Sequence, residues 1–349
     1  MIGTEFLKGS GLGNQLFCYI SARCIALEHG YEFGTASQQE FANNIHSNQG
    51  MYFMDVDLGK EITPEMQKYL KRYDEKEDRV FIGNAIHDMT HGCYISGSDE
   101  HLLNSIEDDT IIYGNLQSED YFGKYKNEIK SWLKVKPEFE SYEYTKDNLC
   151  IINMRGGEYA SEPELYLDRR YWLNAIKAMK KIRPDMEFMI VTEDVAAAHK
   201  VLPEYEAHHF DMGKDYVTIK NARYLILSNS SFAVIPALTS DTVQYVIAPK
   251  YWARHNVSDG YWSSEQNIYS FFNYMDRHGH IFSADECKKE LEEYKKKSAL
   301  FRRLNKKPEG LSKSLQMLRI KLIYADYMFK KIVRKIERET GVIHEYKGL

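Results

Sequence analysis

Short apolar segments alternate with helix-length stretches in the second half of the chain, and this alternation limits the possible folds more than any other feature. We expect strands at residues 149–152, 188–191, 224–227 and 245–247, with an amphipathic helix over 170–182. Apolar strands joined by helices are typical of a parallel, doubly wound sheet that is covered on both faces.

The N-terminal half opens in a similar way. Apolar residues 6–7 predict a short strand, a glycine-rich turn follows at 9–13, and apolar residues then recur at helical spacing from about Asn14 to Gly30, a suitable C-cap. Residues 34–145 are polar and irregular, with helix-like stretches such as 64–73. A chain of 349 residues can form two domains, and we expect the boundary near residue 145.

Composition is that of a globular protein, with 43% hydrophobic and 28% charged residues. The sequence has no run of eighteen apolar residues and no signal-peptide pattern at its N-terminus, so we expect a cytoplasmic protein without a transmembrane helix. Its five cysteines are odd in number and form no CxxC pair, which favours reduced thiols over disulfides or a zinc site.

Charge is distributed unevenly along the chain. Residues 295–338 hold fifteen Lys or Arg against three acidic residues, a net charge of +12, whereas the first 294 residues carry −16. An acidic body argues against nucleic acid as the main partner. The basic C-terminal segment therefore needs its own explanation.

The first motif is the turn Gly11-Leu12-Gly13-Asn14-Gln15. Glycines allow a ligand to approach the backbone closely, and the N-terminus of the following helix presents N–H groups and a positive dipole end. The sequence does not match the dinucleotide-binding pattern GxGxxG counted from Gly9, because Asn14 occupies the position of the third glycine. An ordinary tight turn remains the alternative.

The second motif is Asn153-Met154-Arg155-Gly156-Gly157-Glu158-Tyr159, directly after the strand at 149–152. An arginine at the carboxyl end of a parallel strand points into the crevice where such sheets bind ligands, and its guanidinium suits phosphate oxygens. The two glycines leave room for a diphosphate, and Glu158 is a candidate base. The alternatives are a surface salt bridge for Arg155 and a simple ion pair for Glu158.

The third motif is Ser228-Asn229-Ser230-Ser231-Phe232, after the strand at 224–227. Small hydroxyl side chains at such a turn cap a helix and can donate to phosphate. Taken alone, this motif favours a helix cap without a ligand.

Together the three motifs resemble those of glycosyltransferase family eleven, the α-1,2-fucosyltransferases, over residues 5–250. That family combines a GGLGNQ-type turn, an HxRRGDY-type motif and an NSSF-type motif, and Thr192-Glu193-Asp194 looks like its intervening acidic turn. The resemblance implies an α/β, GT-B-like fold of two Rossmann-like domains facing across a cleft. It divides the chain into an acceptor-side domain (1–145), a donor domain (146–290) and a basic helical tail (291–349).

The resemblance also implies a function, namely inverting, metal-independent transfer of fucose from GDP-fucose to a glycan hydroxyl in polysaccharide biosynthesis, with no cofactor. The catalytic candidates are Arg155, Glu158 and Asn14. The candidates for donor binding are Gly11, Gly13, Asn14, Arg155, Gly157, Asn229, Ser230, Ser231 and Phe232.

Several positions depart from the family pattern. Asn153 replaces the family histidine, Gly156 its second arginine and Glu158 its aspartate, and residues 233–238 lack the usual tryptophans. Another nucleotide sugar as donor, or a non-catalytic glycan-binding relative, therefore stays open.

Two other patterns compete with this assignment. Asp55-Val56-Asp57 has the DxD spacing of metal-dependent glycosyltransferases, although this spacing is common on surfaces. His208-His209 lacks nearby ligands at metal-like spacing, and an exposed strand end explains it.

Apolar residues recur in the basic tail at alternating steps of four and three from 311 to 336, which predicts an amphipathic helical appendage. Packing on the acidic body, self-association as a coiled coil, and peripheral contact with the inner face of the membrane all remain open.

Overall fold

The structure is a computed structural model of the chain. It describes residues 1–7, 9–42, 51–76, 79–81, 93–95, 97–162, 165–256, 262 and 265–297, together with separate helical positions between 314 and 336.

The N-terminal domain is built on a parallel five-stranded sheet in the order β4-β2-β1-β8-β5. Its strands are β1 (Ile2–Glu5), β2 (Phe33–Ala36), β4 (Lys60–Ile62), β5 (Lys71–Asp74) and β8 (Thr110–Tyr113). Its helices are α1 (Leu12–His29), α2 (Gln38–Ala42), α3 (Pro64–Gln67), α5 (Glu100–Asn104), α6 (Glu119–Phe122) and α7 (Lys126–Trp132). Two antiparallel pairs complete it, β3 (Met54–Val56) with β9 (Leu133–Val135), and β6 (Arg79–Phe81) with β7 (Cys93–Ile95).

The C-terminal domain contains a seven-stranded sheet in the order β12-β11-β10-β13-β14-β15-β16, parallel except for the last strand. Its strands are β10 (Leu149–Asn153), β11 (Glu187–Val191), β12 (Glu206–His208), β13 (Tyr224–Leu227), β14 (Tyr245–Pro249), β15 (Asn273–Met275) and β16 (Ile281–Ser283). Its helices are α8 (Arg169–Ile182), α9 (Val195–Val201), α10 (Met212–Lys220), α11 (Val234–Thr239) and α12 (Ala284–Lys297).

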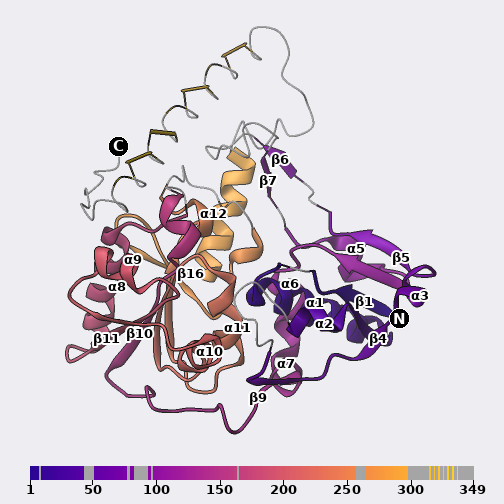
Figure 1. The fold of residues 1–349 in the computed structure, drawn as a ribbon. Coiled ribbons are helices and arrows are strands. Elements are labelled where there is room, and N and C mark those ends of the chain that lie inside the picture. Colours follow the sequence, from indigo (N-terminus) through magenta and orange to yellow (C-terminus); the bar gives the residue numbers. More distant parts are fainter. Residues whose placement is uncertain are drawn as a thin grey trace.

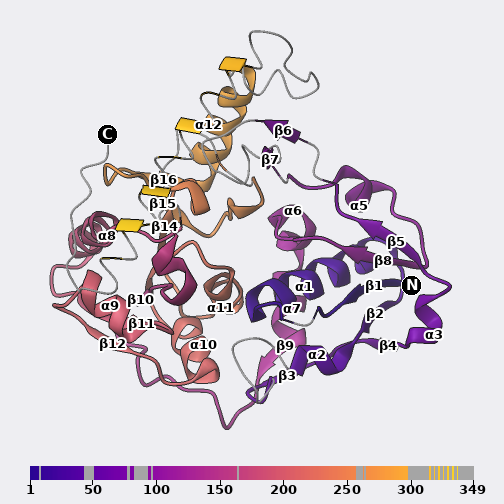
Figure 2. The ribbon, with the colours of Figure 1, turned by 45° about the horizontal axis from the view of Figure 1, so that its top comes forward.

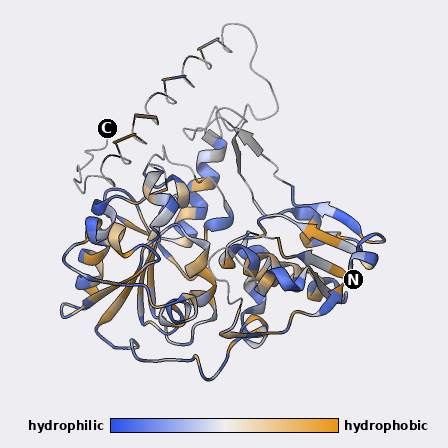
Figure 3. Ribbon diagram, viewed as in Figure 1, coloured by the Kyte–Doolittle hydropathy of each residue, from blue (hydrophilic) through white to orange (hydrophobic). Residues whose placement is uncertain are grey.

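The two domains lie side by side, with α1 and α11 between their sheets (Figures 1 and 2). Apolar residues concentrate on the strands and on the inner helices, whereas the outer helices show hydrophilic faces (Figure 3). The α/β, GT-B-like arrangement expected from the sequence is confirmed. The expected boundary near residue 145 falls between β9 and β10, and α12 continues past residue 290.

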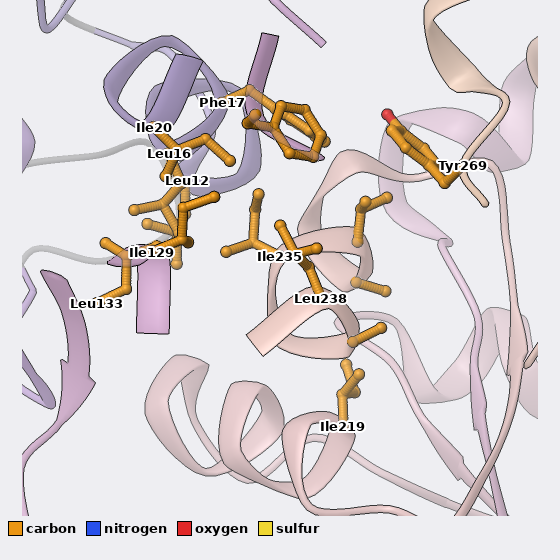
Figure 4. Packing of buried hydrophobic residues seen from close by; sticks show 14 of the residues in the cluster. Leu12, Leu16, Phe17, Ile20, Ile129, Leu133, Ile219, Ile235, Leu238 and Tyr269 are labelled. Carbon is orange, nitrogen blue, oxygen red and sulfur yellow. The ribbon is translucent and has the colours of Figure 1, made fainter. Parts of the chain in front are cut away.

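Helix α1 is buried on nearly all sides because it packs against both domains. Leu12, Leu16 and Ile20 are almost fully buried and share one core cluster with Ile235 and Leu238 of α11 (Figure 4). A helix that is apolar all round has to be covered all round. The shared cluster therefore joins the domains through a hydrophobic interface.

At Gly13 the backbones of the two domains are in tight contact. A Cβ atom on Gly13 would lie 2.5 Å from the carbonyl carbon of Ser231 and 2.6 Å from the amide nitrogen of Phe232. Both neighbours are backbone atoms, which have no rotamers with which to move aside. The first and third sequence motifs are thus in direct contact, and the glycine is required by this contact.

The strands expected at 149–152, 188–191, 224–227 and 245–247 are confirmed as β10, β11, β13 and β14. Other sequence predictions were wrong. The first strand is Ile2–Glu5, and Phe6 instead follows it and packs against Phe41, with ring centroids 4.5 Å apart. The helix-like stretch 64–73 contains only the short helix α3 before the chain enters β5.

Within the described part of the chain, no helix is both long and apolar enough to cross a bilayer. The tail positions that the structure describes between 314 and 336 are helical, as the spacing predicts. Leu311 lies outside the described residues.

Gly13→Ala should force α1 away from Ser231 and Phe232. Because inserting a methyl group into a tight backbone contact costs about 1–3 kcal/mol, we expect a lower Tm in differential scanning calorimetry. Gly123→Ala is the matched control, because its new Cβ meets the flexible side chain of Glu119 at 3.0 Å. A Gly13→Ala variant as stable as the Gly123→Ala variant would contradict this role.

Candidate functional site

A pocket opens where the carboxyl ends of three central strands of the C-terminal sheet meet the N-terminus of α1. Ligands of open α/β sheets bind at such strand ends. Residues from both domains line the pocket, namely Gly11, Leu12, Gly13, Asn14, Asn153, Arg155, Glu158, Tyr159, Val191, Thr192, Glu193, His209, Met212, Asp215, Ser230, Ser231 and Phe232. The structure thus brings together eight of the ten residues that the sequence nominated.

Arg155 follows β10 and is held by two carboxylates. Its Nη1 lies 2.9 Å from Oε1 of Glu193, and its Nη2 lies 3.1 Å from Oε1 of Glu158. The guanidinium also lies over the ring of Tyr159, with its central carbon 5.3 Å from the ring centroid. Arg155 is therefore held at the pocket wall with a fixed orientation.

The two glutamates differ in their surroundings. The side chain of Glu193 is 30% exposed, and burial raises its pKa, although Arg155 and the amide of Gly156 oppose this shift. The side chain of Glu158 is 69% exposed. Glu158 is thus the more accessible carboxylate beside Arg155.

The glycines after Arg155 pack against the turn that follows β11. A Cβ on Gly156 would lie 2.6 Å from Cβ of Asp194, and Gly157 has a φ of +50°, which favours glycine. The amide of Gly157 donates to Oδ2 of Asp194 over 3.2 Å, and Gly157 does not line the pocket. This turn therefore accounts for both glycines.

The motif after β13 divides between the pocket and the core. Ser230, Ser231 and Phe232 line the pocket, and Oγ of Ser230 accepts a hydrogen bond from the amide of Phe232, as a cap does. Asn229 lies outside the lining and is 4% exposed. Its Nδ2 donates to the carbonyl oxygen of Leu165 over 3.0 Å, so the structure places it in an internal contact.

The N-terminus of α1 faces the pocket without a capping side chain. Gly11 is its N-cap, with extended backbone, and the first turn contains no acidic residue. The amide groups of this turn and the positive end of the helix dipole favour an anion. Asn14 lies in the same turn, and its Oδ1 accepts a hydrogen bond from Nε2 of Gln117 over 3.1 Å.

Sequence reasoning missed a histidine–aspartate pair in this pocket. His209, interpreted from the sequence as an exposed strand end, lies with its Nδ1 2.7 Å from Oδ2 of Asp215. Burial raises the pKa of Asp215 to about 6, although hydrogen bonds from His209 and the amide of Phe210 oppose the shift. A six-residue separation across a loop has no periodicity that would have signalled the pair.

The DxD pair lies outside this pocket. Oδ2 of Asp57 is bound by Nη2 of Arg23 at 2.6 Å, and its Oδ1 accepts from the amide of Gly59 at 3.0 Å. Among the described residues, no group of three or more His, Cys, Asp or Glu side chains is arranged to hold a metal ion. The charges beside the pocket come instead from one arginine, three carboxylates and a helix N-terminus.

Comparisons with known proteins add solved structures only. No family model and no curated protein matches the sequence. The structure of NodZ α-1,6-fucosyltransferase soaked with GDP-fucose matches with a TM-score of 0.44 and 15% identity, covering 71% of this chain and 94% of that chain. The fucosyltransferase NodZ from Bradyrhizobium gives a TM-score of 0.43 with 13% identity, over 70% and 94% of the two chains. POFUT1 in complex with GDP-fucose gives 0.41 with 10% identity, over 71% and 97%. TM-scores below 0.5 are too low for these matches to assign a function to this chain.

Asp215→Asn should stabilise the protein increasingly as the pH rises from about 4 to 7. The folded-state pKa of Asp215 is raised above the unfolded value of 3.8, so the folded state binds more protons between these pKa values and wild-type stability falls across them. The measurement is the difference in Tm between variant and wild type at pH 4.5, 6 and 7.5.

Asp211→Asn, at the N-cap of the helix that carries Asp215, is the matched control and should show the opposite trend. Burial raises the pKa of Asp211, but hydrogen bonds from Tyr52 and nearby amides outweigh burial and lower it. The same trend in both variants would contradict the assigned burial of Asp215.

Proposed function

We propose that the chain is an inverting glycosyltransferase that transfers fucose from GDP-fucose to a glycan hydroxyl, in the manner of the α-1,2-fucosyltransferases that its motifs resemble. The observation that carries this proposal is the convergence of Arg155, the α1 N-terminus and the Ser230–Ser231 turn on one pocket between two α/β domains. No metal ion enters the proposed mechanism, so its assays are run in excess EDTA.

The diphosphate of the donor is assigned to the positive groups of the pocket. Negative charge develops on the departing diphosphate, and preorganised donors that stabilise it lower the barrier. Arg155 offers a guanidinium, while the first turn of α1 offers amides and its dipole. The hydroxyl groups of Ser230 and Ser231, in the turn that contacts the N-terminus of α1, can add donors.

The nucleobase is assigned to Asp215. Guanine presents adjacent N–H donors at N1 and N2, which match the two oxygens of a carboxylate. Each oxygen of Asp215 accepts one bond, from His209 or from the amide of Phe210 at 3.1 Å, and a carboxylate oxygen can accept a second. The imidazole of His209 orients the carboxylate.

Glu158 is assigned to accept the proton of the acceptor hydroxyl. The acceptor is a glycan that enters from solvent, and Glu158 is the most exposed of the three pocket carboxylates, with Glu193 at 30% and Asp215 at 8%. Glu193 is assigned instead to hold Arg155. A base in this position assists in-line attack on the sugar carbon as GDP leaves.

Two alternatives are separated by simple assays. A transferase for another GDP-sugar would prefer that sugar in a donor competition experiment. A non-catalytic glycan-binding relative would bind glycans yet release no GDP above the spontaneous rate.

Arg155→Ala should lower the transfer rate by about 10²–10³-fold, because a charged donor to the leaving group is lost. Arg155→Lys should restore only part of the rate, since a lysine lacks the bidentate fork. GDP release in EDTA measures both. The control is Arg183→Ala, whose ion pair with Asp185 lies outside the pocket lining. Near-wild-type turnover in Arg155→Ala would remove Arg155 from the mechanism.

We further propose that the tail contacts an anionic membrane surface on the cytoplasmic side. The stripe residues Leu315, Leu322 and Phe329 are more than 60% exposed, so the body leaves these described positions of the stripe uncovered. Met328 and Val333 flank the stripe and make it broader than the two-position seam of a coiled coil. Residues 295–338 carry +12, and each basic residue near an anionic surface contributes roughly 1 kcal/mol.

The full chain should therefore co-sediment with vesicles containing anionic phosphatidylglycerol and far less with neutral phosphatidylcholine. Phe329→Glu should reduce this binding several-fold, because it puts a negative charge on the apolar stripe, whereas Tyr69→Glu, at an exposed position outside the tail, should not. Equal sedimentation of wild type and Phe329→Glu would contradict the membrane contact. A halved mass of Phe329→Glu in light scattering would identify the stripe as a dimer seam instead.

A further inference from the structure

A row of three side-chain amides runs from the C-terminal domain to the mouth of the pocket. Nδ2 of Asn267 donates to Oε1 of Gln117 over 2.9 Å, and Nε2 of Gln117 donates to Oδ1 of Asn14 over 3.1 Å. Asn14 lines the pocket beside Gly11 and Gly13. Asn14 and Gln117 belong to the N-terminal domain, so the row crosses the domain interface.

We propose that Gln117 and Asn267 are positioning residues that turn the side-chain NH2 of Asn14 toward a phosphate oxygen of the ligand; this rests on the proposed function. A primary amide has one acceptor end and one donor end. Because Gln117 receives a donor at its oxygen, its nitrogen has to face Asn14. The side-chain oxygen of Asn14 then accepts the hydrogen bond from Gln117, which leaves the NH2 group of Asn14 to face the pocket.

The position of Gln117 is fixed by its own loop. The preceding residue, Leu116, is fully buried with a φ of +49°, a conformation that a side chain rarely adopts. Oε2 of Glu75 accepts hydrogen bonds from the amides of Asn115 and Leu116, each over 2.9 Å. The loop is therefore held in one conformation by a carboxylate beneath it.

The position of Asn267 is fixed by its neighbours. Nε2 of Gln266 donates to Oε1 of Glu75 over 2.7 Å, so the residue before Asn267 is bound to the carboxylate that holds the Gln117 loop. The amide of Ser270 donates to Oε2 of Glu119 over 2.8 Å. Asn267 is 5% exposed, which leaves its side chain little freedom.

An NH2 group suits a phosphate oxygen at this place. Asn14 lies in the first turn of α1, where backbone amides and the helix dipole already favour an anion. A side-chain donor would add one charge-assisted hydrogen bond to the same group. Because the row includes Asn267, this donor faces the pocket only when the two domains are docked.

The test is a double-mutant cycle read by the Kd of GDP in isothermal titration calorimetry. Gln117→Met keeps the shape of the side chain but removes both polar ends, so we expect about tenfold weaker binding. Asn14→Ala should weaken binding by a similar factor, and the double variant should bind no more weakly than Asn14→Ala alone. Gln117→Glu, whose side chain can only accept hydrogen bonds, should also weaken the binding of GDP.

Gln67→Met on α3 is the matched control and should bind GDP like the wild type. Wild-type affinity in Gln117→Met, or effects of Gln117→Met and Asn14→Ala that multiply in the double variant, would overturn the positioning role while leaving the proposed function intact. Wild-type protein that binds neither GDP nor inorganic pyrophosphate would overturn both. The Tm of each variant shows whether it is folded. If Gln117→Met does not fold, the same double-mutant cycle is measured with Asn267→Leu in its place.

Discussion

The backbone contact between Gly13 and the Ser231–Phe232 segment is the constraint on which the rest of the structure depends. It brings the N-terminus of α1 against the turn after β13, with less space than a single Cβ atom requires. Below this contact, the apolar faces of α1 and α11 share one core cluster. The pocket lies between the same two segments, so the site is complete only when the two domains are packed together.

Acidic side chains outnumber basic ones in the lining of the site. Arg155 faces Glu158 and Glu193, and Asp215 adds a third carboxylate to the lining. An incoming diphosphate would add further negative charge and compete for Arg155. Since burial raises the pKa of both Glu193 and Asp215, either group can take up a proton more readily than an exposed acid and so reduce the repulsion.

Sequence patterns predicted the C-terminal sheet well because its central strands are buried on both faces. Residues 149–152 of β10 and 224–227 of β13 are continuous apolar runs, and such runs are conspicuous in a sequence. The N-terminal strands were largely missed. Lys60–Ile62 and Lys71–Asp74 are edge strands of three or four residues, mostly exposed and polar, and tertiary pairing rather than composition defines them.

The candidate site likewise contains residues that the sequence could predict and residues that it could not. Arg155 and the Gly11–Asn14 turn could be nominated because each follows a strand and carries its own chemical signature. Asp215 and Gln117 could not, because their importance comes from contacts with His209 and Asn14 that no local spacing encodes. Gly157 and Asn229 were predicted from their motifs, yet both make hydrogen bonds within the C-terminal domain and lie outside the pocket lining.

A crystal structure with bound GDP-fucose would show directly whether both domains bind the donor. We expect the diphosphate within hydrogen-bonding distance of Arg155 and of the first-turn amides of α1, with guanine against Asp215. A nucleotide bound elsewhere, or one that contacts only one of the two domains, would contradict a donor site shared by both domains.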